Sequence, residues 1–416
     1  MNELQGLGVG SILVSSGTLS PILSFGEELG LRFPNVLENK HVVNPRNIHV
    51  SIVGSGATGR ELNSSFIQRQ KTEYYMELGK TLVGLIKCIP KGVLVFFPSY
   101  ANMRRCLEVW GGPVLKAGST PGEEGRWQSR HRGNRAEDFF TKGVSARARM
   151  THGGEFVFQQ QVRTSRTTPT ARKTKTQWDA ILEHKSVVLE PTKASGLKFA
   201  VSEYRRLLHT PHGAGNGNNT TAGGCIFMGV CRGKISEGID FAGDQSRGVI
   251  VTGIPFAPAM EPKVKLKREY LDRLSKESEP SGEDLCGGYL PQDKNQAPKK
   301  ISGEDWYCQQ AHRAVNQAIG RVIRSSDDYG AVLLLDSRFG KLKNSGGLSK
   351  WIRPFVRRET GYNSAREELS EFFSRMARDS NENKRPATTR STEGDQELLP
   401  SNKKVITNPY IRRKTF

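Results

Sequence analysis

A glycine and two arginines recur at helical spacing in the segment from Gln317 to Arg324. Two guanidiniums one helical turn apart, beside a glycine, form a surface that a phosphate chain can approach closely, because a planar guanidinium binds phosphate oxygens bidentately and stays charged. In phosphoryl transfer such groups stabilise the charge that develops on the γ-phosphate. A basic, solvated helix face is the alternative interpretation. The residues that we expect on one helix face, at i, i+3, i+4 and i+7, are Gln317, Gly320, Arg321 and Arg324, with Val322 and Ile323 turned toward a core.

A second segment whose residue types could bind a ligand is Cys231–Phe241. It lies between two apolar runs, Cys225–Val230 and Gly248–Ile254. Both runs predict strands, and the carboxyl end of a parallel strand is where α/β folds place ligands. Two cations there could hold phosphates, two carboxylates could orient an arginine or accept a ribose hydroxyl, and two glycines allow close backbone approach. An ordinary charged surface loop is the alternative. These residues are Arg232 and Lys234, Glu237 and Asp240, and Gly233 and Gly238.

Two further segments are weak signals when each is taken alone. Ser15–Pro21 follows an apolar run and contains Gly17 and Thr18. The run Gly92–Phe97 leads through a proline to Ser99, which is a typical helix N-cap, so free N–H groups there could hold a phosphate. Tyr100 could stack on a base. Structural capping is the alternative for this second segment.

Three other chemistries are excluded by pattern. The glycine-rich stretch Gly54–Arg60 is not followed by Lys-Ser or Lys-Thr, so it predicts a turn or a linker and not a P-loop. No Asp-Glu-x-His segment occurs, so we expect no magnesium site of that kind. The six cysteines form no C-x-x-C pair, which argues against a zinc ribbon or a locally built iron–sulfur cluster.

The elements that must position these residues alternate between strand-like and helix-like runs. The strand-like runs are continuously apolar, which is typical of strands buried on both faces of a parallel sheet. Alternation with helices predicts βαβ units and an open α/β sheet. The predicted strands are Ser11–Ser15, Ile48–Val53, Gly92–Phe97, Ser186–Glu190, Cys225–Cys231, Gly248–Ile254 and Gly330–Asp336, and the predicted helices are Phe66–Cys88, Ala101–Trp110, Leu197–Leu208 and Trp306–Arg324.

Composition divides the chain into one folded domain and two polar stretches. We predict an α/β domain from residues 1–112 and 177–378. Residues 113–176 carry thirteen basic and five acidic side chains and few aliphatic ones, which predicts a disordered, basic, low-complexity insert. Residues 379–416 are similarly polar and predict a disordered tail.

The formal net charge of +20 suits a polyanionic partner, nucleic acid first and an acidic membrane surface second. Charge carried in solvated disordered segments is the alternative explanation. No apolar run approaches transmembrane length, and we expect neither a membrane partner nor a signal peptide.

Taken in order, four segments resemble motifs III, IV, V and VI of the XPD-family helicases of superfamily two. Within that family, Gly248–Phe256 and Trp306-Tyr307 look most like the regulator-of-telomere-length helicases, and the Fanconi-type J helicases come second. The resemblance covers Leu13–Gly112 and Trp178–Phe373. The four segments are Ser16–Leu19, Gly92–Tyr100, Arg232–Phe241 and Gln317–Arg324.

The resemblance implies the second of two RecA-like lobes, with ATP bound between them. The first lobe would carry the P-loop, the carboxylates for Mg²⁺, and an iron–sulfur cluster. In this chain the resemblance implies a catalytic role toward the γ-phosphate for Gln317, Arg321 and Arg324. It implies nucleotide contacts for Gly17, Thr18, Glu237, Gly238, Asp240 and Gly320, and contacts with single-stranded DNA for Ser99, Tyr100, Arg232 and Lys234.

The expected function is that of a C-terminal lobe of an ATP-dependent, 5′-to-3′ DNA helicase, acting in DNA repair or genome maintenance in the nucleus. Its partner would be an N-terminal helicase lobe, in the same gene product or in another chain. Alone, the chain should not hydrolyse ATP, since a P-loop is needed to cradle the phosphates. The alternative is a non-enzymatic nucleic-acid-binding or regulatory module derived from a helicase lobe. An adenylate-binding metabolic enzyme would explain neither the basic charge nor Arg232 with Lys234.

Overall fold

A computed structural model describes most of the chain, and it divides the chain by its contacts into residues 1–376 and residues 377–416. In the second unit only the end of one helix is described, up to Glu382. The described residues are 6–15, 25–26, 29, 33, 35–37, 43–113, 146–150, 156–160, 175–191, 194–209, 223–235, 239–276, 301–341 and 347–382.

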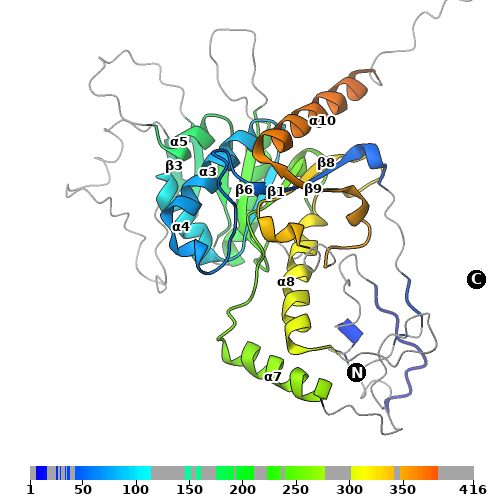
Figure 1. Cartoon of the computed structure of the whole chain (residues 1–416). Coiled ribbons are helices and arrows are strands. Elements are labelled where there is room, and N and C mark those ends of the chain that lie inside the picture. The colour runs from blue at the N-terminus through cyan, green and yellow to red at the C-terminus, as the bar shows by residue number, and fades with distance from the viewer. Residues whose placement is uncertain are drawn as a thin grey trace, which may run out of the picture. The chain divides into compact units, whose positions relative to one another are not determined.

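One sheet organises the first unit (Figure 1). Its strands follow the order β3-β4-β5-β6-β2-β7-β8-β1-β9. From β5 to β9 all neighbouring strands are parallel, whereas β3 and β4 form an antiparallel pair at the β5 edge. The predicted α/β parallel sheet is therefore confirmed. The strands are β1 (Ile48–Ser55), β2 (Val93–Phe97), β3 (Ala146–Met150), β4 (Phe156–Gln160), β5 (Ser186–Leu189), β6 (Cys225–Val230), β7 (Gly248–Val251), β8 (Gly330–Leu334) and β9 (Val356–Gly361).

Both faces of the parallel sheet are buried, as the continuous apolar runs predict. Alternate residues of β2 enter two different cores: Val95 packs in one and Phe96 in the other, and each is at most 1% exposed. The first core includes residues of α3 (Thr72–Ile86), α4 (Tyr100–Trp110), α5 (Gln177–Leu182) and α10 (Tyr362–Glu382). The second includes residues of α6 (Leu197–Leu208) and α8 (Gly303–Ile319), and α7 (Pro262–Lys276) packs on α8 (Figure 1).

Three predicted elements differ from the structure. Ser11–Ser15 is not a strand, and its Leu13 is 93% exposed, so this apolar run gains no sheet partner. The helix predicted to start at Phe66 starts at Thr72, because Phe66 and Ile67 are exposed and lie outside the core. The helix predicted to reach Arg324 ends at Ile319.

The two polar stretches contain more backbone order than expected. Strands β3 and β4 lie within the predicted insert 113–176, where Ala146–Met150 and Phe156–Gln160 alternate or cluster apolar residues. Helix α10 continues four residues into the predicted tail, to Glu382. The remaining residues of both stretches lie outside the described ones, so the domain boundaries stay a prediction. None of the described helices is long and apolar enough to cross a membrane.

Lys185 is a buried, titratable side chain at the amino end of β5. It is 1% exposed, and its ammonium donates a 2.9 Å hydrogen bond to the carbonyl of Lys91. The pKa of Lys185 is lowered to about 7 from an ordinary value of 10.5, mainly by burial; Cys225 opposes the shift and the nearby charge of Lys91 adds to it. The fold therefore disfavours the protonated form.

Replacing Lys185 should change how stability depends on pH. Between pH 7 and 10.5 the unfolded chain binds one more proton at Lys185 than the folded chain, so the free energy of unfolding rises with pH in that window. The slope from this group is at most about 1.4 kcal/mol per pH unit. In Lys185→Met this contribution should disappear. Denaturant unfolding of both proteins at several pH values measures it, and parallel pH profiles would contradict it.

Candidate nucleotide and nucleic-acid site

Three of the site segments lie at the carboxyl edge of the sheet, because parallel strands end on the same side. Strand β2 leads to Ser99, strand β5 to Glu190 and strand β6 to Arg232, whereas the segment after α8 leads into the amino end of β8 and meets the loop after β6 farther along that loop. The predicted residues Gly17 and Thr18, and also Glu237 and Gly238, lie outside the described residues.

Ser99 caps α4, as predicted. Its backbone is extended, and its hydroxyl accepts a 3.2 Å hydrogen bond from the backbone N–H of Asn102. Tyr100 is the first residue of the helix, and its hydroxyl donates to the carboxylate of Glu190. The cap orients the first turn, so its N–H groups and Tyr100 face the carboxyl edge of the sheet.

The loop after β6 holds Arg232 in an unusual backbone conformation. Arg232 has φ of +62°, in the left-handed region, which costs a non-glycine residue about 1–2 kcal/mol. Gly233 donates a 2.8 Å hydrogen bond to the carbonyl of Val230, and the ammonium of Lys234 donates to the carbonyl of Pro191 at 3.3 Å. Such strain persists only where surrounding contacts over-determine it, and it is frequent at functional sites.

Glu190 supplies those contacts, although no sequence pattern singles it out. The side chain follows β5 and is 4% exposed. Its carboxylate accepts the backbone N–H of Val230 at 2.8 Å and that of Ile235 at 3.3 Å. A carboxylate at the end of a predicted strand is an ordinary feature, so only the fold could show that it closes this loop.

The segment around Arg321 is not helical, which corrects the prediction of one helix face. Helix α8 ends at Ile319. The N–H of Gly320 still bonds four residues back to Asn316, but those of Arg321 and Val322 bond only three residues back, to Ala318 and Ile319. Gly320 has low helix propensity, and the branched pair after Arg321 favours leaving the helix. That pair, Val322 and Ile323, is buried as predicted, at 1% and 4% exposure.

Both arginines nevertheless contact the loop after β6. The guanidinium of Arg321 donates to the carbonyl of Ile239, and that of Arg324 forms a 3.1 Å ion pair with Asp240. Burial lowers the pKa of Arg321, the charge of Arg324 lowers it further, and Asp240 opposes both. Gln317 and Gly320 are half-buried beside them. The structure thus joins the two segments that were predicted to act together.

Side chains of α3 occupy the glycine-rich loop after β1. Its concave side holds the carboxylate of Glu77, which accepts the N–H of Thr58 at 2.6 Å and the hydroxyl of Thr58 at 2.5 Å. Ala57 N–H bonds to the hydroxyl of Thr81. Because these donors are satisfied internally, the loop offers no cradle for phosphate, in line with the predicted turn.

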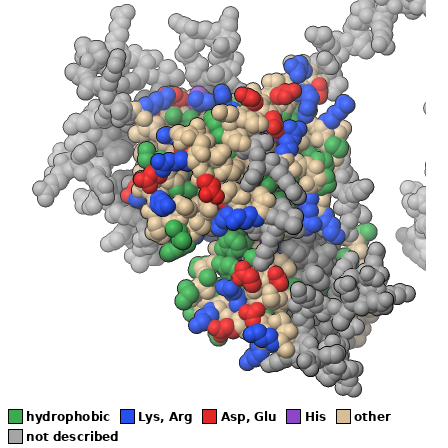
Figure 2. Space-filling model, in the orientation of Figure 1, with side chains coloured by type: hydrophobic (Ala, Val, Ile, Leu, Met, Phe, Trp, Pro, Cys, Tyr) green, Lys and Arg blue, Asp and Glu red, His purple; other side chains and the backbone are tan. Residues whose placement is uncertain are grey.

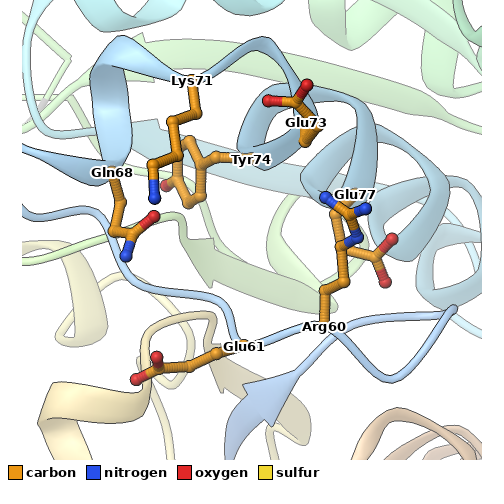
Figure 3. A pocket seen from close by; sticks show the side chains of 7 residues that line it. All are labelled: Arg60, Glu61, Gln68, Lys71, Glu73, Tyr74 and Glu77. Carbon is orange, nitrogen blue, oxygen red and sulfur yellow. The ribbon is translucent and has the colours of Figure 1, made fainter.

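A polar cavity of about 460 Å³ lies beside that loop (Figure 3). Acidic and basic side chains both line it, and none of the predicted site residues does. The lining residues are Arg60, Glu61, Gln68, Lys71, Glu73, Tyr74 and Glu77.

The surface charge is mixed as well. Figure 2 shows Lys and Arg among acidic and apolar side chains on this face of the described residues.

The residues present fit part of a nucleotide site. Two guanidiniums beside a backbone turn suit phosphate oxygens. Mg²⁺ needs oxygen ligands, and among the described residues no group of three or more His, Cys, Asp or Glu side chains could hold a metal ion. This chain therefore offers cations to a phosphate chain but no described cage for its metal.

Comparison with known proteins decides the family. A model of the helicase C-terminal domain family matches residues 147–355. The chain belongs to this family. The match begins within the stretch that we predicted to be an insert.

Relatives of this helicase C-terminal domain include regulators of telomere elongation. The chain is 37% identical over 373 residues to a "Regulator of telomere elongation helicase 1 homolog" of Oryza sativa subsp. japonica, covering 90% of this chain and 29% of that protein. It is 34% identical to the "Regulator of telomere elongation helicase 1" of Homo sapiens, covering 90% and 24%. The chain therefore spans less than a third of these relatives. A solved XPD helicase aligns at 18% identity and a TM-score of 0.45, over 85% of this chain and 44% of that one.

Relieving the backbone strain at Arg232 should raise the stability of the fold and weaken the binding of single-stranded DNA. Arg232→Gly should raise the free energy of unfolding by about 0.5–1 kcal/mol, which is the left-handed strain less the extra backbone entropy of glycine. It should also weaken binding of an oligothymidylate. Lys91→Gly is the control, because Lys91 has φ of +54° and lies at the opposite edge. It should gain stability with unchanged binding. Chemical unfolding and fluorescence anisotropy measure both, and equal loss of binding in the two variants would contradict the assignment.

Proposed function

We propose that this chain is the second motor lobe of an ATP-dependent DNA helicase that moves 5′-to-3′ along single-stranded DNA during genome maintenance in the nucleus. Membership of the helicase C-terminal domain family supports the motor lobe. The names of the relatives support genome maintenance. The polarity rests on the sequence resemblance to XPD-family helicases.

One observation supports the proposal: the loop after β6 carries the residues proposed for DNA and contacts the arginines proposed for the nucleotide. At its start the loop after β6 presents Arg232 and Lys234, which are the proposed contacts for DNA phosphates. At its end Ile239 and Asp240 contact Arg321 and Arg324, which are the proposed contacts for the γ-phosphate. A shift of the arginines toward a nucleotide would therefore release the same backbone that carries the proposed DNA contacts.

The arginines are held in a state that a nucleotide can redirect. Arg324 is paired with a carboxylate that is 74% exposed, and such exposed pairs contribute little, about 0–1 kcal/mol. Exchange of this partner for a phosphate costs little and gains a stronger, bidentate contact. Asp240 keeps the guanidinium oriented beforehand, and Gln317 and Gly320 flank the approach.

ATP with Mg²⁺ would supply the phosphoryl group and the leaving-group charge between this lobe and an N-terminal lobe. Residues 239–241 and 317–324 would bring positive charge to the γ-phosphate when the two lobes close. Gly17, Thr18, Glu237 and Gly238 are proposed nucleotide contacts from the sequence resemblance alone. An iron–sulfur cluster would belong to the N-terminal part.

Single-stranded DNA would cross the carboxyl edge of the sheet. The N-capped first turn of α4 offers N–H groups to a phosphate, and Tyr100 offers an aromatic ring to a base. Arg232 and Lys234 add cations one loop away. These contacts involve backbone phosphates and stacking, so they favour binding without sequence preference.

Removing one guanidinium should separate hydrolysis from strand binding. In a protein reconstituted with both lobes, Arg321→Ala should lower the ATPase rate by roughly 10³-fold, as expected for loss of an arginine that stabilises transition-state charge. Binding of an oligothymidylate without nucleotide should be unchanged. Arg206→Ala, on the exposed face of α6, is the control for losing one cation. Undiminished turnover in Arg321→Ala would refute the role, and strand binding without any ATPase activity in the reconstituted protein would favour a non-enzymatic module.

A further inference from the structure

Glu190 is a buried carboxylate that lies between the two segments assigned to DNA contact. Three backbone N–H groups of the loop after β6 surround it: Val230 at 2.8 Å, Ile235 at 3.3 Å, and that of Lys234. Burial raises the pKa of the Glu190 carboxyl, and these N–H groups oppose the rise. One side chain thus satisfies donors at both ends of a short, strained turn.

The turn is built around the carboxylate so tightly that a side chain at Gly233 would not fit. A Cβ atom there would lie 2.5 Å from Oε1 of Glu190 and 2.7 Å from the carbonyl oxygen of Val230. At Gly229 a Cβ would approach Oε2 to 3.1 Å. The close approach fixes the path of the backbone on either side of Arg232, whose φ is positive.

The same carboxylate reaches the second segment. The hydroxyl of Tyr100 donates to Glu190, and the contact with this anion, after burial, raises the pKa of the phenol. The next residue, Pro191, accepts the ammonium of Lys234 through its carbonyl at 3.3 Å. The residues at the end of β5 therefore make three contacts: with the hydroxyl of Tyr100, with the backbone around Arg232, and with the side chain of Lys234.

We propose that Glu190 is a positioning residue for single-stranded DNA: its carboxylate sets the relative placement of Tyr100, Arg232 and Lys234 without touching the strand. The inference rests on the proposed function, since it presupposes that these three residues bind DNA. The sign of the effect separates it from simple electrostatics. Removal of a negative charge near a polyanion site should strengthen binding through long-range attraction, whereas loss of positioning should weaken it.

The chain contains a matched control in Glu77. This side chain is also buried, at 2% exposure, and also closes a turn by accepting a backbone N–H and a hydroxyl, those of Thr58. Its loop carries none of the proposed DNA contacts. Glu77→Gln therefore has the same chemistry, removes the same charge and carries a similar cost to folding.

The test compares strand affinity in the full chain for Glu190→Gln, Glu190→Asp and Glu77→Gln, with circular dichroism melting to establish folding. The probe is a fluorescein-labelled oligothymidylate, titrated over a range of salt concentrations.

Glutamine accepts hydrogen bonds through one oxygen only, and aspartate keeps the charge of Glu190 but has a shorter side chain. Both Glu190 variants should bind about tenfold more weakly, the effect of losing one charge-assisted contact. The salt dependence should flatten by about one phosphate contact. Glu77→Gln should bind as the parent does.

A double-mutant cycle with Arg232→Ala/Lys234→Ala distinguishes failure of the positioning role of Glu190 from failure of the proposed DNA site. If Glu190 acts through these cations, Glu190→Gln should have a much smaller effect in that background, because coupled residues are non-additive. An equal effect in both backgrounds, tighter binding by Glu190→Gln, or equal weakening by Glu77→Gln would overturn the positioning role while leaving the proposed function intact. Unchanged binding by Arg232→Ala/Lys234→Ala itself would overturn the proposed DNA site and the inference together. If Glu190→Gln fails to fold, Glu190→Asp decides by the same criteria.

Discussion

The backbone that follows β6 is tied at both ends by charged side chains from other elements. Glu190 accepts its N–H groups at the start, and Arg321 and Arg324 contact Ile239 and Asp240 at the end. Both ties depend on a parallel sheet, because only that topology brings the ends of β5 and β6 to one edge, with the segment after α8 reaching the same loop. The other features of the site, including the strained Arg232, follow from this constraint.

A loop fixed in this way can transmit a small movement. Its two anchors differ in kind: one is a buried carboxylate with several hydrogen bonds, and the other includes a surface ion pair that contributes little on its own. The buried end is therefore the more stable anchor, and the arginine end is the part that we propose a nucleotide recruits. The glycine-rich turn after β1 offers no phosphate cradle, since Glu77 fills it. A motor lobe that contributes cations to a nucleotide held elsewhere is consistent with both facts.

The sequence predicted the sheet well because a strand that is buried on both faces is apolar at every position, as in the β2 segment Val93–Phe97. It predicted the cap at Ser99 because capping is local. It failed at Gly320, where spacing alone suggested a continued helix, while a glycine and the burial of Val322 with Ile323 end it. It also missed Glu190, whose role depends on residues about forty positions away. Ser11–Ser15 shows the reverse error, since apolar residues predict a strand only if a neighbour exists to pair with it.

We propose that Arg321 and Arg324 leave the loop after β6 for a nucleotide bound against another lobe. A structure of the two-lobe protein with ADP and aluminium fluoride, which mimics the transferring phosphoryl group, measures this directly. We expect guanidinium nitrogens of Arg321 and Arg324 about 3 Å from the fluoride ligands, with Arg324 no longer paired with Asp240. Guanidiniums that remain on Ile239 and Asp240 in a closed, nucleotide-bound state, with no contact to the fluoride, would contradict it.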